Sequence, residues 1–214
     1  MSSDFLHRID FFERVAPYYD TLLDLLTIGL YSKFLKRTVG ILAPKRGEKI
    51  LDLCSGTGRA ASWMAQAVMK EGEVIGMDAA KGMVEVATNQ YGGMGNLTFL
   101  QKDVTQPWEY QNYFDGIFIS FSLHELPESE REGVLEKSYF ALKERGRMVI
   151  ADFNPQISGV RKIVLFTFFK LFERENLNFL SLDQNEILRK VRFKEIETFL
   201  ILFGLFQITL AQKS

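Results

Sequence analysis

The segment ILDLCSGTGRA, residues 50–60, decides the fold. It opens with a short apolar run, passes through a loop that contains Gly56 and Gly58, and leads into the helical pattern RAASWMAQAVMK. A strand, a glycine turn and a helix in this order are typical of open α/β sheets, in which ligands bind beyond the carboxyl ends of the strands. The segment therefore predicts both the fold class and the position of a ligand site.

Short apolar runs and helical patterns alternate along the chain after this segment. The runs KILDL, EVIGM, NLTFL, FDGIFIS and GRMVIAD predict strands, and KGMVEVATNQ and ESEREGVLEKSYFALKE predict further helices. Strands that alternate with helices of this length indicate a parallel sheet with helices on both faces. We expect an α/β fold, a Rossmann-like doubly wound sheet of seven mainly parallel strands.

The two ends of the chain follow other patterns. Residues 5–42 read as helices broken near Pro17 and Gly29, and another helical pattern spans about 182–191. Two apolar runs, FKEIETFLIL and LFQITLAQ, meet at Gly204 and predict an antiparallel C-terminal hairpin. We expect one domain over residues 1–214, made of an N-terminal helical lid (1–44), a cofactor-binding core (45–153), lid helices (154–192) and the hairpin (193–214).

Composition and charge exclude several classes of function. The chain is 47% apolar and 25% charged, which is ordinary for a globular protein, and its net charge of −1 gives no basic field for nucleic acid. Cys54 is the only cysteine, so we expect no disulfide, no metal site and a cytoplasmic location. We expect no signal peptide or membrane-spanning segment, because no apolar run has the required length.

The glycine loop alone leaves the ligand open. Gly56, Gly58 and Ala61 satisfy the G-x-G-x-x-A pattern of dinucleotide sites, but so short a pattern also recurs by chance or in a plain tight turn. Asp52, at the end of the first strand, would repel a pyrophosphate and attract an ammonium group. The loop therefore needs further residues to identify its ligand.

Two more aspartates stand at the ends of the next two strands. Asp78 lies about 22 residues after Gly56, where a carboxylate accepts ribose hydroxyls, and Asp103 lies within reach of a purine amino group. Each aspartate taken singly could be a capping or turn residue. Together with Asp52 they describe an ammonium, a ribose and an adenine without phosphates, which is S-adenosylmethionine. The helix that follows Gly58 would then face the carboxylate of this ligand.

The chain resembles the class I S-adenosylmethionine-dependent methyltransferases, and more narrowly the ubiquinone/menaquinone-biosynthesis methyltransferase group. The resemblance covers nearly the whole chain, through the segments FERVAPYYDTLLDLLTIGLYSKFLKR, ILDLCSGTG, GMDAAKGMVEVA, QKDV, FDGIFISFSLHELP and FKEIETFLILFGLFQITLAQK. The first contains an Ala-x-x-Tyr-Asp element at Ala16, Tyr19 and Asp20. In the group's D-x-G-x-G-x-G pattern, Cys54 takes the place of the first glycine, which we interpret as a small residue tolerated beside the cofactor.

The resemblance and the loop together give a set of expected cofactor contacts. Met83 would pack its side chain on the cofactor or belong to the plain core, and Val104 would act through its backbone amide. The full set is Tyr19, Asp52, Ser55, Gly56, Thr57, Gly58, Asp78, Ala79, Met83, Asp103, Val104 and Ser120.

The loop SLHELP after the fourth strand is the expected place of catalysis. His124 and Glu125 are adjacent there, and a histidine titrates near neutral pH, so the pair can act on a proton. Alternatively His124 packs beneath a lid and Glu125 caps or solvates the next helix. Tyr19 is a third candidate, either toward the methyl acceptor or as an amphipathic residue at a helix end. The methyltransferase group usually has another sequence in this loop.

The segment RKIVLFTFFKLFER, residues 161–174, is unusually rich in apolar side chains. Ile163 and Phe166 fall opposite the main apolar face, so a plain amphipathic helix does not need them. This excess predicts a lid for a lipophilic acceptor, a dimer contact or a peripheral membrane contact, beside ordinary core burial. The main face consists of Val164, Leu165, Phe168, Phe169, Leu171 and Phe172.

These observations predict an S-adenosylmethionine-dependent methyltransferase that acts on a small, lipophilic acceptor such as a quinone precursor. A methyltransferase for phospholipid head groups or other small molecules is the alternative. A nicotinamide-dependent oxidoreductase and an inactive cofactor-binding partner subunit are the remaining readings. The sequence leaves open whether the chain is a monomer or a homodimer.

Overall fold

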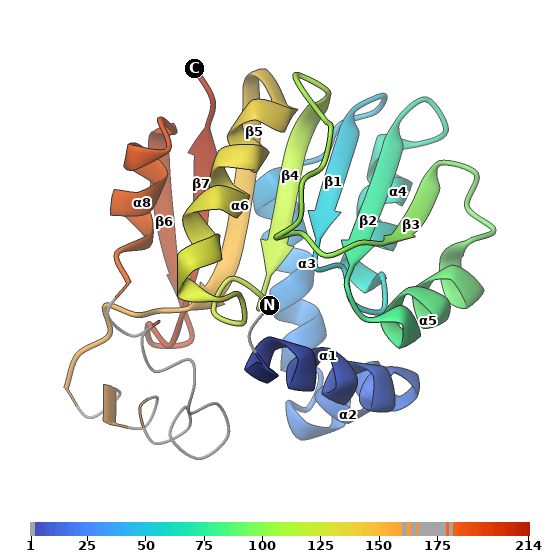
Figure 1. Ribbon diagram of the computed structural model, residues 1–214, viewed down its shortest axis with the longest axis horizontal. Helices are drawn as coiled ribbons and strands as arrows, with labels where there is room; N and C mark the ends of the chain where they lie inside the picture. Colours follow the sequence, from blue (N-terminus) through green and yellow to red (C-terminus); the bar gives the residue numbers. More distant parts are fainter. Residues whose placement is uncertain (1–2, 160–161, 164–165, 167–178, 180–181) are drawn as a thin grey trace.

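The computed structural model describes residues 3–159, 162–163, 166, 179 and 182–214. They form a seven-stranded sheet in the order β3-β2-β1-β4-β5-β7-β6 (Figure 1). The first five strands are parallel, and β7 runs antiparallel to both β5 and β6. This arrangement confirms the predicted fold class. The strands are β1 (Lys49–Leu53), β2 (Glu73–Asp78), β3 (Leu97–Gln101), β4 (Phe114–Ser120), β5 (Leu142–Phe153), β6 (Lys194–Ile201) and β7 (Phe206–Gln212).

Helices cover both faces of the sheet because its central strands are apolar on both sides. On one face, α3 (Leu30–Leu42) and α4 (Arg59–Val68) pack Leu42 and Met64 against the sheet. On the other face, α6 (Glu128–Ala141) and α8 (Gln184–Lys190) contribute to a second core. Figure 1 shows α6 in front of the sheet and α3 behind it. The helix α5 (Lys81–Tyr91) contacts β2 and β3, and its Tyr91 packs against the core that α3 and α4 share.

The N-terminal helices lie across the carboxyl ends of the parallel strands (Figure 1). They are α1 (Ser3–Val15), the single 3-10 turn η1 (Ala16–Tyr18) and α2 (Tyr19–Leu26). The chain breaks at Pro17 and at Gly29, whose φ of +71° suits glycine, as the sequence predicts. Where α1 meets the start of α5, the Lys81 amide donates a hydrogen bond to Glu13 over 3.3 Å.

One predicted boundary is wrong. The helix expected to reach residue 144 ends at Ala141, and β5 begins at Leu142 instead of Gly146. Leu142 pairs with Phe114, the register then shifts, and Arg147 pairs with Gly116. Burial of Leu142 and Phe114, both fully inaccessible, outweighs the helical tendency of the intervening lysine and glutamate.

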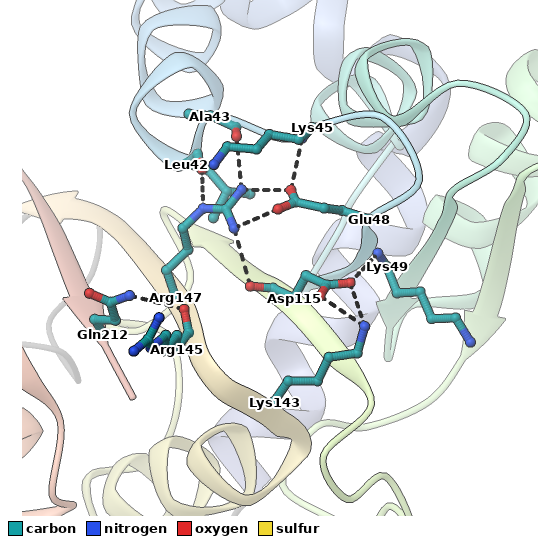
Figure 2. Close-up of polar contacts among 10 residues, drawn as sticks. All are labelled: Leu42, Ala43, Lys45, Glu48, Lys49, Asp115, Lys143, Arg145, Arg147 and Gln212. Atoms are coloured by element: carbon teal, nitrogen blue, oxygen red, sulfur yellow. Dashed lines mark hydrogen bonds and ion pairs between the residues drawn. The ribbon is translucent and has the colours of Figure 1, made fainter. Parts of the chain in front are cut away.

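A polar network closes the opposite edge of the sheet, where the strands begin (Figure 2). Arg147 donates hydrogen bonds to the carbonyls of Leu42 and Ala43, which end α3. Its guanidinium also contacts both carboxylate oxygens of Glu48, at 3.0 and 2.7 Å, and the Asp115 carbonyl at 3.4 Å. Four separate parts of the chain are therefore joined through one side chain, far from the carboxyl ends of the strands.

The segment 161–174 is described only at residues 162, 163 and 166, where it is helical. The side chains of Ile163 and Phe166 are 65% and 44% exposed. The main apolar face predicted for this segment lies outside the described residues. Among the helices that the structure describes, none is both long and apolar enough to cross a membrane.

Candidate active site

A cavity of about 110 Å³ opens at the carboxyl ends of the parallel strands. Its floor comes from the ends of β1, β2 and β4 and the loops that follow them, and its cover comes from α1, α2 and the start of α3. Ile9, Phe12 and Tyr19 reach it from the N-terminal helices. The cavity lies where the glycine loop predicts a ligand site.

The glycine loop enters this cavity from β1. Gly58 has a φ of +79°, and a Cβ there would lie 2.4 Å from the Phe99 ring, so only glycine fits. Gly56 has a φ of +53°, but the space where its Cβ would point is open. A ligand can therefore approach the backbone at Gly56, whereas Gly58 lets the loop pack on the sheet.

Three buried polar atoms on this cavity have no hydrogen-bond partner among the described residues. They are Asp52 Oδ2, Ser55 Oγ and Asp103 Oδ2. Buried polar groups in proteins are almost always paired, and a buried oxygen that lacks a partner costs about 1–3 kcal/mol. Because the three residues line one cavity, these atoms indicate a ligand with several hydrogen-bond donors.

Three other oxygens of Asp78 and Asp103 accept hydrogen bonds from the protein. Asp103 Oδ1 accepts hydrogen bonds from the Thr105 amide and hydroxyl, both at 2.8 Å, which leaves Oδ2 directed elsewhere. Asp78 accepts from the amides of Gly56 and Ala80 at 2.8 and 2.9 Å. Each carboxylate oxygen has two lone pairs, so Asp78 retains sites for further donors.

Burial dominates the electrostatics of the two strand-end aspartates. It raises the pKa of Asp52 well above the usual value, the nearby Asp78 raises it further, and a hydrogen bond from the Ala61 backbone opposes the shift. Burial also raises the pKa of Asp78, against backbone hydrogen bonds from Ala80, Gly56 and Ala79. Two buried carboxylates side by side favour a cation, which would relieve both effects.

The cover is fastened to the glycine loop by polar contacts. The Thr57 hydroxyl donates to Asp20 Oδ1 at 2.9 Å, and Arg59 Nε lies 3.2 Å from Asp20 Oδ2. Arg59 Nη1 also pairs with Asp24 at 2.9 Å. The Tyr-Asp element of α2 thus closes over the loop through its aspartate, while Tyr19 lines the cavity beside Phe12.

One end of the cavity is aromatic. Tyr31 and Phe121 line it, with their ring centroids 5.8 Å apart, and Phe34 and Phe206 pack behind Phe121 at 5.2 and 5.5 Å. Burial raises the pKa of Tyr31 well above its usual value, so the phenol stays neutral. Phe121 follows β4 with a φ of +50°, a strained conformation for a bulky residue. These rings form an apolar wall on the side of the cavity that Ser120 and Glu125 also line.

His124 lies behind this wall and does not line the cavity. Its side chain is 3% exposed and packs edge-on against Phe153 and Phe179. Nδ1 lies 2.6 Å from Asp152 Oδ1, and Nε2 lies 3.3 Å from Glu125 Oε1. The predicted catalytic role of His124 therefore does not take the form of direct contact with a ligand in this cavity. Glu125, by contrast, does line the cavity.

The loop after β3 is held by Lys137 of α6. Its ammonium donates to the carbonyls of Val104, Thr105 and Gln106 at 2.7, 2.7 and 2.9 Å. Burial lowers the pKa of Lys137. Sequence reasoning missed this lysine, because nothing in its helix marks it as a contact of a distant loop.

Cys54 takes a left-handed backbone conformation, with a φ of +53°. This explains why glycine suits the position in the D-x-G-x-G-x-G pattern. Burial raises the pKa of the thiol well above its usual value, and the charges of Asp78 and Asp52 add to the shift. A thiol in this setting is not a nucleophile.

Most of the predicted residues come together. All the expected cofactor contacts except Gly58 line the cavity, as do Tyr19 and Glu125. No sequence pattern selects four further residues that line it, namely Tyr31, Phe121, Ser122 and Leu126. In the part of the chain that the structure describes, no group of three or more His, Cys, Asp or Glu side chains could hold a metal ion.

Comparison with solved structures bears on the fold. A methyltransferase from Aquifex aeolicus, described as dependent on S-adenosylmethionine, superimposes with a TM-score of 0.64 at 19% identity, over 84% of this chain and 89% of its own. Phosphoethanolamine N-methyltransferase 2 of Haemonchus contortus, in complex with S-adenosyl-L-methionine, gives 0.64 at 16% identity, over 79% and 49%. At such identities the likeness establishes the fold alone.

Sequence comparison establishes the family. Demethylmenaquinone methyltransferase of Lactobacillus johnsonii is 32% identical over 171 residues, 76% of this chain and 67% of its own length. Ubiquinone/menaquinone biosynthesis C-methyltransferase UbiE of Erwinia tasmaniensis is 31% identical over 157 residues, 72% and 62%. The chain thus matches about two thirds or less of the length of these curated relatives.

The family model of the ubiE/COQ5 methyltransferases matches residues 6–180. This match covers most of the chain and includes the glycine loop, the three strand-end aspartates and the loop that carries Glu125. At the level of the family it confirms the expected methyltransferase class. The chain belongs to the ubiE/COQ5 methyltransferase family.

Proposed function

We propose that this chain transfers a methyl group from S-adenosylmethionine to a small, lipophilic acceptor. The observation that carries the proposal is that Asp52, Ser55 and Asp103 all line one cavity and each has a buried oxygen without a partner among the described residues. A nucleoside that carries an ammonium group supplies donors for such atoms. A pyrophosphate does not, because it would meet carboxylates.

Different residues of the cavity would bind different parts of the ligand. Asp103 would accept from the adenine amino group, Asp78 from the ribose hydroxyls and Asp52 from the ammonium group. The start of α4 would face the ligand carboxylate. When bound, S-adenosylmethionine supplies a methyl group activated by its positive sulfur. The protein must hold the acceptor in line with that methyl group and exclude water, and the closed N-terminal helices serve both needs.

The aromatic end of the cavity supports a flat, apolar acceptor. Tyr31 and Phe121 offer ring faces there, and ring stacking adds about 0.5–1.5 kcal/mol per contact to the burial of apolar area. The relatives' names indicate a quinone precursor, methylated at carbon in the UbiE case. A quinone ring is electron-poor, so we propose that the reduced, hydroquinone form is the nucleophile.

Two other functions fit less well. A phospholipid head group is charged and strongly hydrated, whereas the described acceptor wall is made of rings. A nicotinamide dinucleotide would place its pyrophosphate against Asp52 and leave Asp103 without a role. An inactive partner subunit would bind the cofactor but transfer no methyl group, so an assay of methyl transfer distinguishes it from an active enzyme.

The first experiment is calorimetry with S-adenosylhomocysteine and, in parallel, with NADH. We expect binding of S-adenosylhomocysteine only. Absence of binding heat at about 1 mM ligand, which corresponds to a binding free energy weaker than about −4 kcal/mol, would refute the proposal.

The second experiment is transfer of a labelled methyl group from S-adenosylmethionine to chemically reduced demethylmenaquinone. Cofactor binding without transfer to this probe or to extracted cell lipids would identify the inactive partner subunit instead.

We also propose that the end of the molecule that holds the cavity touches the membrane surface when a lipophilic acceptor enters. Leu25 and Leu26 at the end of α2 are 74% and 70% exposed, and Ile28 between α2 and α3 is 89% exposed. Flotation with liposomes of mixed neutral and anionic lipid tests this. Ile28→Asp should reduce the bound fraction, and equal flotation of the variant and the wild type would contradict it. The proposed cytoplasmic location rests on the single cysteine alone.

A further inference from the structure

Three side chains form a connected line from the core to the cavity. Asp152, near the end of β5, is fully buried, His124 is 3% exposed, and the Glu125 side chain is 19% exposed and lines the cavity. Asp152 Oδ1 lies 2.6 Å from His124 Nδ1, and His124 Nε2 lies 3.3 Å from Glu125 Oε1. The line thus ends on a carboxylate at the acceptor side of the site.

The hydrogen-bond donors around Asp152 fix the direction of the histidine. The amide of His124 donates to Asp152 Oδ2 at 3.1 Å, and that of Phe153 donates to Oδ1 at 2.8 Å. A carboxylate that receives two amides is an acceptor, so His124 places its Nδ1–H toward Asp152 and turns Nε2 toward Glu125. The ring is therefore oriented by a partner of its own, as in a catalytic triad.

The backbone that carries the pair is fixed as well. Arg131 of α6 is 2% exposed, and its guanidinium donates to the carbonyls of Leu123, His124 and Leu126, each at 3.1 Å. Among the described residues, the charged groups that face His124 include Asp152 on β5, Glu125 on its own loop and Arg131 on α6. A loop held this way keeps the Glu125 carboxylate in one place relative to the cavity.

His124 Nε2 and Glu125 Oε1 lie 3.3 Å apart, which is an ion-pair distance when the imidazole is protonated. With Nδ1–H directed to Asp152, a second proton on Nε2 gives this imidazolium, whereas a neutral imidazole leaves Nε2 as an acceptor beside the carboxylate. In the first case the imidazolium lies between two carboxylates, and Glu125 faces the cavity with charged oxygens. That carboxylate can accept a further proton from a molecule in the cavity.

We propose that Glu125 accepts the proton that the methyl acceptor loses, and that His124 and Asp152 position it for this step. As the nucleophilic atom of the acceptor bonds to the methyl carbon, the methyl–sulfur bond breaks and its electron pair stays on sulfur. The acceptor then gives its proton to a Glu125 oxygen, which releases it to water when the product leaves. The inference rests on the proposed function. Glu125 is the catalytic residue of the three, because it alone lines the cavity.

The coupling of the two side chains is testable without any acceptor. The chain contains only two histidines, so His7→Gln leaves His124 as the single signal in ¹⁵N-histidine NMR. Glu125→Gln removes a carboxylate next to the imidazole, and we expect the pH midpoint of His124 to fall by about one unit. Glu130→Gln, an exposed change in the first turn of α6, is the matched control. An identical titration of His124 in wild type and Glu125→Gln would overturn the proposal.

The kinetic test uses chemically reduced demethylmenaquinone as acceptor. Glu125→Gln should lower kcat about 10²–10⁴-fold, with the affinity for S-adenosylhomocysteine kept. Asp152→Asn should lower kcat about tenfold and move the acidic limb of its pH profile, which a merely structural change would not do. A Glu125→Gln enzyme with normal kcat refutes this inference alone. Failure of the wild type to bind S-adenosylhomocysteine refutes the proposed function, and the NMR comparison still decides on the pair.

Discussion

Asp52 shows how ligand binding and stability oppose each other at a single residue. It is 2% exposed, its Oδ2 has no partner among the described residues, and Asp78 lies close enough to raise its pKa. An ionised carboxylate in this position weakens the ligand-free protein. The same feature makes it a strong site for an ammonium group, because a cation removes the penalty.

Asp52→Asn should therefore stabilise the ligand-free protein at neutral pH and weaken cofactor binding. Because the folded-state pKa lies above the unfolded value, ionisation of Asp52 lowers stability as pH rises from about 4 through the folded-state pKa. At pH 7.5 the wild type carries more of this penalty than at pH 4, and we expect the variant to gain about 1 kcal/mol, or roughly 2–4 °C in Tm.

Urea unfolding at pH 4 and at pH 7.5 measures this effect, with Asp10→Asn as an exposed control. The gain should shrink at the lower pH, where Asp52 is protonated in the folded state. A variant as stable as wild type at both pH values, with unchanged affinity for S-adenosylhomocysteine, would show that Asp52 is neither ionised nor in contact with the ligand.

Cys54 should react slowly with alkylating reagents. Burial raises its pKa well above the usual value, so at pH 8 the thiolate that reacts is scarce. We expect iodoacetamide to modify it at least tenfold more slowly than N-acetylcysteine, and more slowly still with S-adenosylhomocysteine present. Intact-mass spectrometry follows the reaction. Fast labelling that the ligand does not affect would place Cys54 outside the site.

At the residue scale, the sequence reveals polar contacts better than apolar ones. The aspartates and glycines follow strands at a recognisable spacing, so Asp52, Asp78 and Asp103 could be selected in advance. Tyr31 and Phe121 could not, because an aromatic residue in an apolar run is ordinary core. Asp152 was missed for a related reason: it lies in a buried strand, 28 residues from the histidine that it orients.

At the element scale, Arg147 links the segments at the end of the sheet where the parallel strands begin. Its five hydrogen bonds join the end of α3, Glu48 before β1, and the Asp115 carbonyl of β4 (Figure 2). Arg147→Lys keeps the charge but loses the planar fork. We expect a loss of about 2–3 kcal/mol in unfolding free energy, since several hydrogen bonds to a charged group disappear.

The exposed Arg145 is the matched control for this change, because only its backbone carbonyl takes part in the network. Arg145→Lys should alter unfolding by less than about 0.5 kcal/mol. Affinity for S-adenosylhomocysteine should stay the same in both variants, since the network lies at the edge opposite the cavity. A large loss of affinity in Arg147→Lys would mean that the two edges of the sheet are coupled.

The sequence predicts elements well where the apolar period is regular and poorly where tertiary pairing competes. The order of strands and helices, the two breaks in the N-terminal helices and the hairpin at Gly204 all follow from local patterns. The junction of α6 and β5 does not, because the segment LKERG is helical by propensity. Its first residue is drawn into the sheet by Phe114, a partner that no local window contains.

At the scale of the whole molecule, the site is completed by a part of the chain that lies far from it in sequence. The α1–α2 segment covers the strand ends, and Asp20 and Asp24 fasten it to Thr57 and Arg59 of the glycine loop. A bound molecule the size of the cofactor must pass this cover. The strength of the fastening should therefore set how fast the cofactor leaves.

Asp20→Asn and Asp24→Asn should speed the dissociation of S-adenosylhomocysteine to different extents. Asp20 is 20% exposed and holds both Thr57 and Arg59, whereas Asp24 is 40% exposed and holds Arg59 alone. An exposed ion pair contributes about 0.2–1 kcal/mol, so Asp24→Asn should raise the off-rate by up to about fivefold and Asp20→Asn by more. Glu71→Gln, which breaks a surface ion pair with Arg46 away from the cavity, should leave the off-rate unchanged.

Stopped-flow displacement measures the off-rates, and hydrogen exchange over residues 3–26 measures the opening of the cover directly. If the ligand fails to slow exchange there in the wild type, the N-terminal helices do not act as a lid, and the rate order predicted for the three variants has no basis.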